Sequence, residues 1–399
     1  MSVRLSVVIP VYNQAERLLL TLASLRHQCP GDYSAEVVLV DDGSNDGSAE
    51  VAAGVPLPFP RAVVRSPSNQ GRSAARNRGV EAAAGDVILF LDGDMIAAPD
   101  LLAKHASYHQ TGRAWTVTGA TRFLRVYSCL YPDDTDFRRR LTRFAATRPT
   151  LAARLHEIER ARPSGPIQLF GPEQVESGEY QQWSFQLASA ACFDQLVREY
   201  GPELVDFPMG WATVFTGNLS VPKAVLKDVG LFDEGFRGWG YEDQDLGFRL
   251  HLAGYGHCCA LDADSYHQEH PSSHDERLAS GRENFARLCR KHPDLRIWTL
   301  GFSVSSPYWN VRILGRVLLD YQHLSSYGGV PEAMTVFPHV VARQAVRFVG
   351  DEPPVDPTPL PADPLPGPSA ALTSELKARA PWFYRALDYA AKNGLWPGA

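Results

Sequence analysis

Cysteine is scarce in this chain. There are six cysteines among 399 residues, and none stands in a Cys-x-x-Cys pair or in the regular spacing of a disulfide framework. Because small secreted domains depend on such frameworks, the pattern predicts reduced thiols in a cytosolic protein. The six positions are Cys29, Cys129, Cys192, Cys258, Cys259 and Cys289.

Long apolar runs are also missing. No segment approaches the roughly 18 consecutive apolar residues that a membrane span needs. The N-terminal apolar run, Leu5–Val11, lacks the longer apolar core and the small-residue cleavage site of a signal peptide. We therefore expect a soluble, cytoplasmic protein without a transmembrane segment, which leaves peripheral membrane contact open.

Neither sign of charge is in large excess. Lys and Arg number 39 and Asp and Glu 45, a formal net charge of -6, so nothing global indicates a nucleic-acid partner. A composition of 44% hydrophobic and 21% charged residues is typical of globular proteins. The length allows one large domain or two to three smaller ones, and the sequence shows no internal repeat.

What the first part of the chain does contain is a regular alternation of strands and helices. Short apolar runs predict buried strands, and Leu18, Leu22 and Leu25 recur at helical spacing between two of them. The alternation predicts an α/β fold with a mostly parallel, doubly wound sheet, which binds ligands beyond the carboxyl ends of its strands. The predicted strands are Leu5–Val11, Glu36–Val40, Ala62–Arg65 and Val87–Leu91, and the predicted helices are Ala15–Arg26 and Ser73–Ala84.

The rest of the chain is less regular and more helical. Residues 281–350 have a mainly helical pattern, and the proline-rich segment 351–368 is typical of an extended linker. Other expected elements are an arginine-rich helix over Asp136–Arg162, an apolar segment at Phe215–Val221, a helix at Glu242–Ala253 and a final amphipathic helix at Thr373–Asn393.

The triplet Asp92-Gly93-Asp94 directly follows a predicted strand. Two carboxylates one residue apart at such a place are costly unless something compensates them, and a hard cation such as Mg²⁺ or Mn²⁺ prefers carboxylate oxygens. The cation would bridge these oxygens to a diphosphate, and Gly93 would let the backbone approach closely. The alternative is an acidic turn that caps the next helix.

Asp41-Asp42 ends another predicted strand and has the same ambiguity. An aspartate there can accept a hydrogen bond from a nucleobase imide or a ribose hydroxyl, or it can cap a helix ahead of Ala49-Glu50. Nearby, Arg72 could reach a phosphate, whereas we expect Arg76 to pair internally with an aspartate.

Three acids, Glu242, Asp243 and Asp245, open a predicted helix. Compensation of the helix dipole explains acids in a first turn, at about 0.3–1 kcal/mol each. It does not explain Gly238-Trp239-Gly240-Tyr241 ahead of them. Flexible glycines around an exposed indole suit a wall that stacks on a sugar, and a carboxylate beside it could deprotonate a hydroxyl.

The segment Tyr266-His267-Gln268-Glu269-His270 carries two histidines after a strand-like stretch. This arrangement indicates a metal ligand, although it lacks the close-spaced histidines of a zinc site. A metal site made of one of these histidines and a carboxylate distant in sequence is a simpler interpretation than a zinc site with several histidines.

In their order along the chain, these segments resemble glycosyltransferase family 2, which has the GT-A fold. The segments are SVVIPVYNQ, VVLVDDGSNDGS, NQGRSAARNRG, ILFLDGDM, FTGNLSVPK, FDEGFRGWGYEDQDLGFRL and YHQEH. Each motif alone is weak, but their order and spacing are specific. The resemblance implies an inverting, metal-dependent transferase that uses a nucleotide-sugar donor.

The resemblance also implies roles for individual residues. Asp243 would be the general base, while Glu242, Trp239 and Tyr241 would bind the acceptor. Asp94 and His267 would bind Mn²⁺ or Mg²⁺, with His270 as the second choice to His267, and Asp92 would lie near the ribose. The donor-binding set would be Pro10, Val11, Tyr12, Asp41, Asp42, Arg72, Asp92, Gly93, Gly217 and Asn218.

The substrates are less constrained than the class. A uridine diphosphate sugar is the best prediction because paired aspartates suit the base imide, and a guanosine or thymidine donor stays open. The acceptor could be a glycan, a lipid-linked glycan, a protein or a small molecule. Two other functions stay open: a non-catalytic nucleotide-sugar binding module, and a nucleotidyltransferase, which also uses strand-end acids and a metal.

The motifs divide the chain into regions. The basic helix of the insertion, with Arg138, Arg139, Arg140 and Arg143, could contact an anionic acceptor or a membrane, or form a solvated face. The last helix could dock on the core or on a second subunit, or stay mobile. The predicted regions are a nucleotide-sugar-binding half at 1–118, a partly helical insertion at 119–205, an acceptor-binding and catalytic half at 206–280, a helical extension at 281–350, a proline-rich linker at 351–369 and a C-terminal helix at 370–399.

Overall fold

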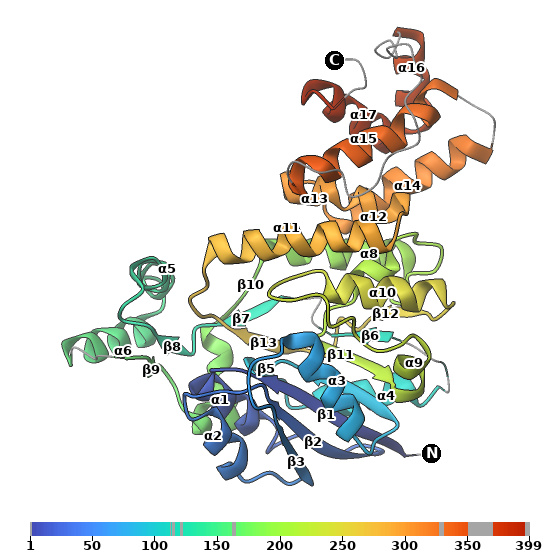
Figure 1. Ribbon diagram of the computed structural model, residues 1–399. Helices are drawn as coiled ribbons and strands as arrows, with labels where there is room; N and C mark the ends of the chain where they lie inside the picture. The colour runs from blue at the N-terminus through green and yellow to red at the C-terminus, as the bar shows by residue number, and fades with distance from the viewer. Residues whose placement is uncertain are drawn as a thin grey trace.

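The architecture is built on a seven-stranded mixed sheet with the order β12-β6-β11-β4-β1-β2-β3 (Figure 1). The computed structural model describes residues 2–111, 113, 116–119, 123–161, 165–326, 331–349 and 370–395. In one half of the sheet, β1 (Val3–Val11) runs parallel to β2 (Tyr33–Asp41) and to β4 (Val87–Leu91). Strand β3 (Arg61–Arg65) continues this half in parallel with β2.

The other half of the sheet departs from parallel order. Strand β11 (Asn218–Pro222) is antiparallel both to β4 and to β6 (Thr116–Thr118), and β12 (His257–Cys259) is parallel to β6. The expected mostly parallel α/β sheet is therefore confirmed, with a reversal of direction at β11.

Helices cover both faces of the sheet because successive strand residues point to opposite sides. Val7 packs in a cluster with Leu18 and Leu102, whereas its neighbour Val8 packs with Val80 and Leu246 on the other face. The helices of the first face are α1 (Ala15–Ser24) and α4 (Leu101–His109), with α2 (Ser48–Gly54) beside α1; those of the second face are α3 (Arg72–Ala82), α9 (Lys223–Asp228) and α10 (Glu242–Leu252).

A second, four-stranded sheet with the order β10-β7-β13-β5 brings distant segments together. Strand β13 (Ser265–Gln268) is antiparallel to β5 (Met95–Ala97), so that His267 pairs with Met95. This pairing places His267 beside the triplet that ends in Asp94. The other two strands are β7 (Leu124–Val126), which lies beside β13, and β10 (Ser184–Gln186) at the edge of the sheet.

The insertion forms a separate lobe at one side of the molecule (Figure 1). Its basic stretch is two helices, α5 (Thr135–Ala145) and α6 (Pro149–Arg160), so the expected single helix over Asp136–Arg162 is wrong. Pro149 begins α6 because proline suits the first helical position but not a helix interior. The lobe and the segment after it also contain β8 (Cys129–Leu130), β9 (Ile167–Gln168), α7 (Pro172–Glu176), the 3₁₀ helices η2 (Glu179–Trp183), η3 (Ala188–Ala190) and η4 (Gly210–Thr213), and α8 (Ala191–Tyr200).

The C-terminal part is a helical layer that packs on α8 and α10, beyond the β12 end of the sheet (Figure 1). The single final helix expected from the sequence is divided into two helices in the structure, and Pro381 begins the second of them. That second helix docks on the core, since Phe383 is fully buried against Phe337 and Tyr321. The helices are α11 (His274–Lys291), α12 (Leu295–Thr299), α13 (Gly301–Ser305), α14 (Val311–Ser326), α15 (Pro331–Val349), α16 (Ala370–Arg379) and α17 (Pro381–Lys392). The proline-rich linker at 351–369 lies outside the described residues.

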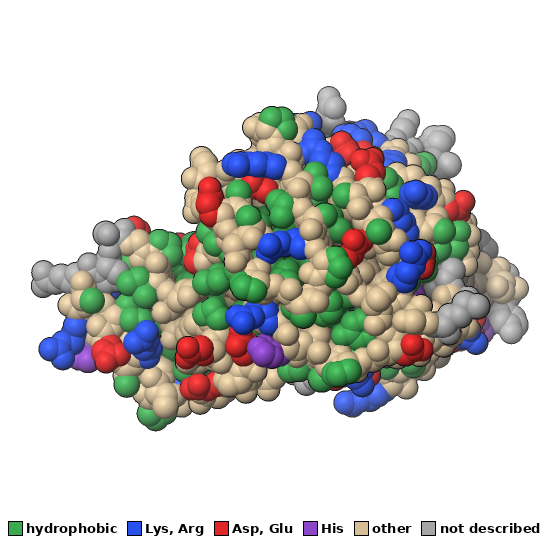
Figure 2. Space-filling view, turned by 90° about the horizontal axis from the view of Figure 1, so that it is seen from below, with side chains coloured by type: hydrophobic (Ala, Val, Ile, Leu, Met, Phe, Trp, Pro, Cys, Tyr) green, Lys and Arg blue, Asp and Glu red, His purple; other side chains and the backbone are tan. Residues whose placement is uncertain are grey.

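The surface and the thiols agree with the composition. On the face shown in Figure 2, acidic and basic side chains are interspersed. In the basic helix, Arg138 pairs with Glu159 at 3.2 Å and Arg139 with Asp136 at 2.7 Å. All six cysteines are free thiols, as expected. Across the described parts of the chain, no helix has both the length and the hydropathy to cross a membrane.

Candidate active site

The carboxyl ends of β1, β2 and β4 meet at one edge of the sheet. The parallel register pairs Val11 with Asp41, and Val8 with Phe90. Each of these strands therefore delivers its next residues to the same crevice, as the sequence predicted. Those residues are Pro10 to Tyr12, Asp41 and Asp42, and Asp92 to Asp94.

The aspartates after β2 are buried and held by the backbone. Asp41 accepts a hydrogen bond from the Ser44 amide at 2.9 Å, and Asp42 accepts from the amides of Gln70 and Gly71 at 2.9 and 2.8 Å. The second oxygen of Asp42, Oδ1, is buried and accepts no hydrogen bond from the described residues, but it lies 3.7 Å from the Arg78 guanidinium, with which it forms an ion pair. The alternative role as a helix cap is wrong, because Gly47 is the N-cap of α2.

A ligand-sized space begins at the residue after Asp42. A hollow of about 450 Å³ is lined by Gly43, Ser44 and Arg65, together with Ser66 and Pro67. Tyr12 is 48% exposed at the end of β1, whereas Pro10 and Val11 are buried. Of these three, only Tyr12 has an exposed side chain, while Pro10 and Val11 belong to the buried end of β1.

The triplet after β4 divides its two carboxylates between different partners. Asp92 is one-third exposed and accepts a hydrogen bond from Arg76 at 3.0 Å. Gly93 is buried against Gln14 and the Pro10 carbonyl, and a Cβ there would lie 2.2 Å from the Gln14 amide nitrogen. A larger residue at this position would have to displace the Gln14 amide.

Asp94 faces two histidines. Its Oδ2 lies 3.8 Å from His267 Nε2 and 3.5 Å from His270 Nε2, and ligand atoms of the three residues lie within 4.8 Å of one another. Burial raises the pKa of Asp94, but the two histidines and Arg17 outweigh it and hold that pKa well below its usual range. One carboxylate and two imidazoles form a donor set that suits a divalent cation such as Mn²⁺. Both histidines belong to the cluster, although the sequence favoured His267 over His270.

Glu269 completes this arrangement and was missed from the sequence. Its carboxylate lies 3.4 Å from His267 Nδ1 and forms an ion pair with Arg125. Burial raises the pKa of Glu269, but His267 and Arg125 lower it to about 2, so the group is a carboxylate. A carboxylate behind a histidine fixes which ring nitrogen faces the metal. The His-x-Glu spacing of His267 and Glu269 in YHQEH was the available signal.

Asp243 stands in the first turn of α10 and is held by a residue that the sequence did not single out. Thr216 donates to it twice, from its hydroxyl at 2.7 Å and from its amide at 3.2 Å. Burial and the adjacent Glu242 raise the pKa of Asp243 to about 7, against the opposing effects of Arg76 and Thr216. A carboxyl group with that pKa can accept a proton near neutral pH.

Arg76 joins the two halves of the site. It is 2% exposed, and its guanidinium donates to Asp92 and, at 3.2 Å, to Glu242. Burial lowers the pKa of Arg76, but Asp92, Asp243 and Glu242 raise it further, so the side chain is a fixed cation. The expected internal pairing with an aspartate is confirmed, and the pairing with Glu242 adds a second partner.

Trp239 is presented on a glycine loop that α11 holds in place. The indole is 43% exposed, and the Arg277 guanidinium lies 4.5 Å from its ring centre. Asn284 of α11 donates to the carbonyls of Arg237 and Gly240 at 2.8 and 2.9 Å. Tyr241 differs from Trp239, because its ring packs on Phe285 at 5.1 Å inside a hydrophobic cluster. The exposed aromatic wall is therefore Trp239.

Of the remaining residues expected to bind the donor, Arg72 and Gly217 lie at the site, whereas the Asn218 side chain points away from it. Arg72 is exposed and donates to the Gly238 carbonyl at 3.4 Å, beside the loop of Trp239. Gly217 borders Asp92, whose amide donates to the Gly217 carbonyl. The Asn218 side chain instead points inward, where it bonds His105, Ala263 and Ser265. Asn218 thus orders the sheet, and its amide is not available to a donor.

The comparisons with known proteins agree on one class. Residues 6–151 match the family described as glycosyl transferase family 2, and residues 200–271 match one described as the N-terminal domain of galactosyltransferase. An uncharacterized glycosyltransferase of Bacillus subtilis (strain 168), YfnE, is 32% identical over 328 residues, which are 80% of this chain and 78% of that protein. By these relationships the protein is a glycosyltransferase. It belongs to glycosyltransferase family 2, as the motifs indicated.

More distant relatives are also named as glycosyltransferases. The validoxylamine A glucosyltransferase of Streptomyces hygroscopicus subsp. jinggangensis (strain 5008) is 29% identical over 73% of this chain and 61% of its own length. Among solved structures, the mannosyltransferase PcManGT of Pyrobaculum calidifontis, in complex with GDP-Man and Mn2+, aligns with 99% of this chain and 88% of its own, at 16% identity and a TM-score of 0.46.

Proposed function

We propose that this glycosyltransferase is inverting and metal-dependent, and that it transfers a sugar from a uridine diphosphate donor to an acceptor hydroxyl. The observation that carries the proposal is the Arg76 bridge. This buried cation bonds Asp92 at the end of β4 and Glu242 at the start of α10. It ties the acids of the donor side to those of the acceptor side in one site.

On the donor side, Asp42 is the proposed acceptor of the base imide. Its Oδ2 accepts hydrogen bonds from two backbone amides, while its buried Oδ1 accepts none and faces the Arg78 guanidinium at 3.7 Å. An unsatisfied buried carboxylate oxygen is costly, and an imide N–H would satisfy it. Tyr12 would cover the base, and Arg72 would reach the phosphates.

Asp94, His267 and His270 would hold the divalent cation, with Glu269 behind His267. Bound there, Mn²⁺ or Mg²⁺ would supply electrostatic stabilisation of the charge that develops on the departing diphosphate. Asp92, which bonds Arg76, would lie near the ribose of the donor.

On the acceptor side, Asp243 would take the proton of the acceptor hydroxyl. The oxygen would then form the new bond to the anomeric carbon from the face opposite the diphosphate, which departs with its bonding electron pair. The configuration at that carbon is inverted by this single displacement. Thr216 fixes the orientation of Asp243, and Trp239 offers its exposed face to the acceptor sugar.

A thermal-shift panel of nucleotide sugars, with and without Mn²⁺, tests this assignment. We expect a uridine diphosphate sugar to raise the melting temperature only when Mn²⁺ is present, and the Asp94→Ala variant to lose that effect. The exposed Asp136 supplies a matched control, Asp136→Ala, which should keep it. An equal shift without metal, or a shift that survives in Asp94→Ala, would contradict the metal assignment.

A further inference from the structure

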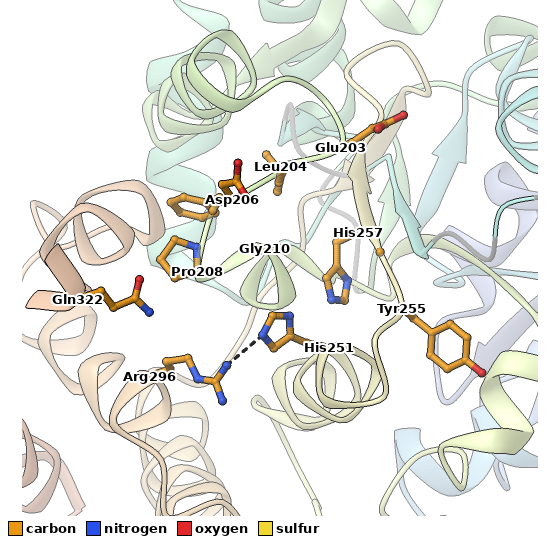
Figure 3. Close-up of a pocket in the computed structure, with 12 residues that line it drawn as sticks. Glu203, Leu204, Asp206, Pro208, Gly210, His251, Tyr255, His257, Arg296 and Gln322 are labelled. Carbon is orange, nitrogen blue, oxygen red and sulfur yellow. Dashed lines mark hydrogen bonds between the residues drawn. The ribbon is translucent and has the colours of Figure 1, made fainter. Parts of the chain in front are cut away.

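A second cavity lies away from the proposed site, at the junction between the sheet domain and the helical extension (Figure 3). Its volume is about 380 Å³. The segment 203–210, the end of α10 and the start of β12 form one side, while Arg296 of α12 and Gln322 of α14 come from the other. His251, at the end of α10, is eight residues from Asp243, so along the helix the cavity is about 12 Å from the proposed base.

The cavity contains a buried imidazole, that of His257, which stacks on the ring of His251 at 6.2 Å. His257 is 6% exposed, and neither of its ring nitrogens has a hydrogen-bond partner in the described part of the chain. Burial and the nearby His251 lower the pKa of His257 to about 3, so the ring is neutral. A neutral imidazole presents one N–H donor and one nitrogen acceptor. Both are buried here, and leaving both unsatisfied is costly.

The wall beside His257 contains two residues in an uncommon backbone conformation. Leu204 and Asp206 have φ angles of +48° and +62°, in the left-handed region that non-glycine residues rarely adopt. Both line the cavity. Backbone strain of this kind persists where the surroundings enforce it, and it clusters at binding sites.

The charges of the lining disfavour an ionic ligand. Among the described residues that line the cavity, Arg296 is the only Lys or Arg. Asp294 accepts hydrogen bonds from the Nε and Nη2 of Arg296 at 2.9 and 2.7 Å, and the Nη1 of Arg296 lies 3.0 Å from His251 Nε2. Asp206 would repel an anion, whereas Glu203 forms an ion pair with Arg113 at 3.0 Å. An ammonium group would donate but could not accept from the imidazole N–H, and an apolar ligand would leave both ring nitrogens unsatisfied.

A hydroxyl group both donates and accepts, so a polyhydroxylated ligand matches the imidazole at both nitrogens. The Gln322 amide, which likewise donates and accepts, reaches toward the cavity from α14 (Figure 3). Buried Phe207 and Leu204 offer apolar surface for the C–H face of a ring. We propose that this cavity is a second carbohydrate site, which binds one neutral saccharide unit on His257 and Gln322.

Imidazole ¹⁵N NMR tests the site directly. The full-length protein would be titrated with glucose, galactose, N-acetylglucosamine and maltose up to about 50 mM, in the weak range expected for a small ligand. At least one sugar should shift the His257 nitrogen resonances saturably, and phosphate and ethylammonium should not. If no sugar shifts them, water alone satisfies His257 and the proposal fails; saturation by phosphate or by the amine overturns the class of ligand.

Two variants separate binding from folding. His257→Phe should abolish saturable binding of the active sugar, as measured by saturation-transfer NMR, and Gln322→Leu, on an exposed helix position, should weaken it about tenfold. His156→Gln replaces an exposed histidine of the insertion and should change nothing. Unchanged affinity in Gln322→Leu, or sugar binding that survives in His257→Phe, would overturn the proposal whatever the transferase activity of the variants.

Discussion

Asp94 and Asp243 are two half-buried carboxylates whose surroundings move their pKa values in opposite directions. Asp94 faces His267 and His270, which hold its pKa low, whereas Asp243 stands beside Glu242 and has a pKa raised to about 7. The first group is a permanent anion that suits a cation, and the second can exchange a proton at neutral pH. The difference shows how one residue type can serve two tasks in one site.

The largest expected effect comes from removing the proposed proton acceptor, Asp243. Asp243→Asn keeps the size of the side chain and one oxygen for the Thr216 hydroxyl, but it cannot take a proton. We expect turnover to fall by about 10²–10⁴-fold, the usual contribution of a general base. A coupled assay of nucleoside diphosphate release measures it. Donor binding, measured by thermal shift, should be unchanged.

The matched control is Asp136→Asn in the insertion, whose side chain is 79% exposed. It should keep full turnover. Normal turnover in Asp243→Asn, with donor binding intact, would show that another group takes the proton.

The next largest effect tests what holds the two halves together. Arg76→Met removes a buried cation and leaves Asp92 and Glu242 without it. Breaking a buried ion pair by removing one partner costs about 3–5 kcal/mol, because the remaining charge is uncompensated. Urea denaturation should show this loss in the free energy of unfolding.

An exposed ion pair provides the contrast. Arg138→Met removes the partner of Glu159 on the surface of the insertion, where both side chains are 40% or more exposed. Such pairs contribute about 0–1 kcal/mol. If the two variants lose equal stability, the Arg76 bridge has no special structural role.

These contacts also show what the sequence could predict. The strand ends at Asp42 and Asp92 were predictable, because short apolar runs mark parallel strands and such strands meet at one edge. The contact of Thr216 with Asp243 was not, since it joins residues 27 positions apart across a loop and a helix. Asn218 was misplaced for a related reason: sequence does not show whether an amide turns toward a ligand or toward His105.

The breaks in the helices were different, because their signal was present. Pro149 and Pro381 each begin a helix, a position that proline favours, yet the helical periodicity on both sides suggested one continuous element. Periodicity reports which residues face the core and not where the backbone changes direction. The second sheet could not be predicted from periodicity either, because its strands β5 and β13 are short and come from distant segments.

A smaller effect is expected at the proposed metal site around Asp94. Glu269→Gln keeps the shape of the side chain but removes the charge behind His267. Outer residues of this kind contribute about 10–100-fold to metal affinity. Titration calorimetry with MnCl₂ should show a loss of that size. The control Glu276→Gln, on the exposed start of α11, should bind Mn²⁺ as the unmodified protein does; equal affinity in all three proteins would remove Glu269 from the metal site.

The smallest effect is a shift in pH dependence. Because Asp243 acts as a base only when deprotonated, kcat/KM should fall about tenfold per pH unit below its pKa near 7 and level off above it. Thr216→Val removes a hydroxyl that favours the charged form, so its acid limb should move to higher pH. Glu242→Gln removes a like charge, so its limb should move to lower pH. Limbs that move together, or that stay fixed while turnover changes, would mean that the pH dependence belongs to a group other than Asp243.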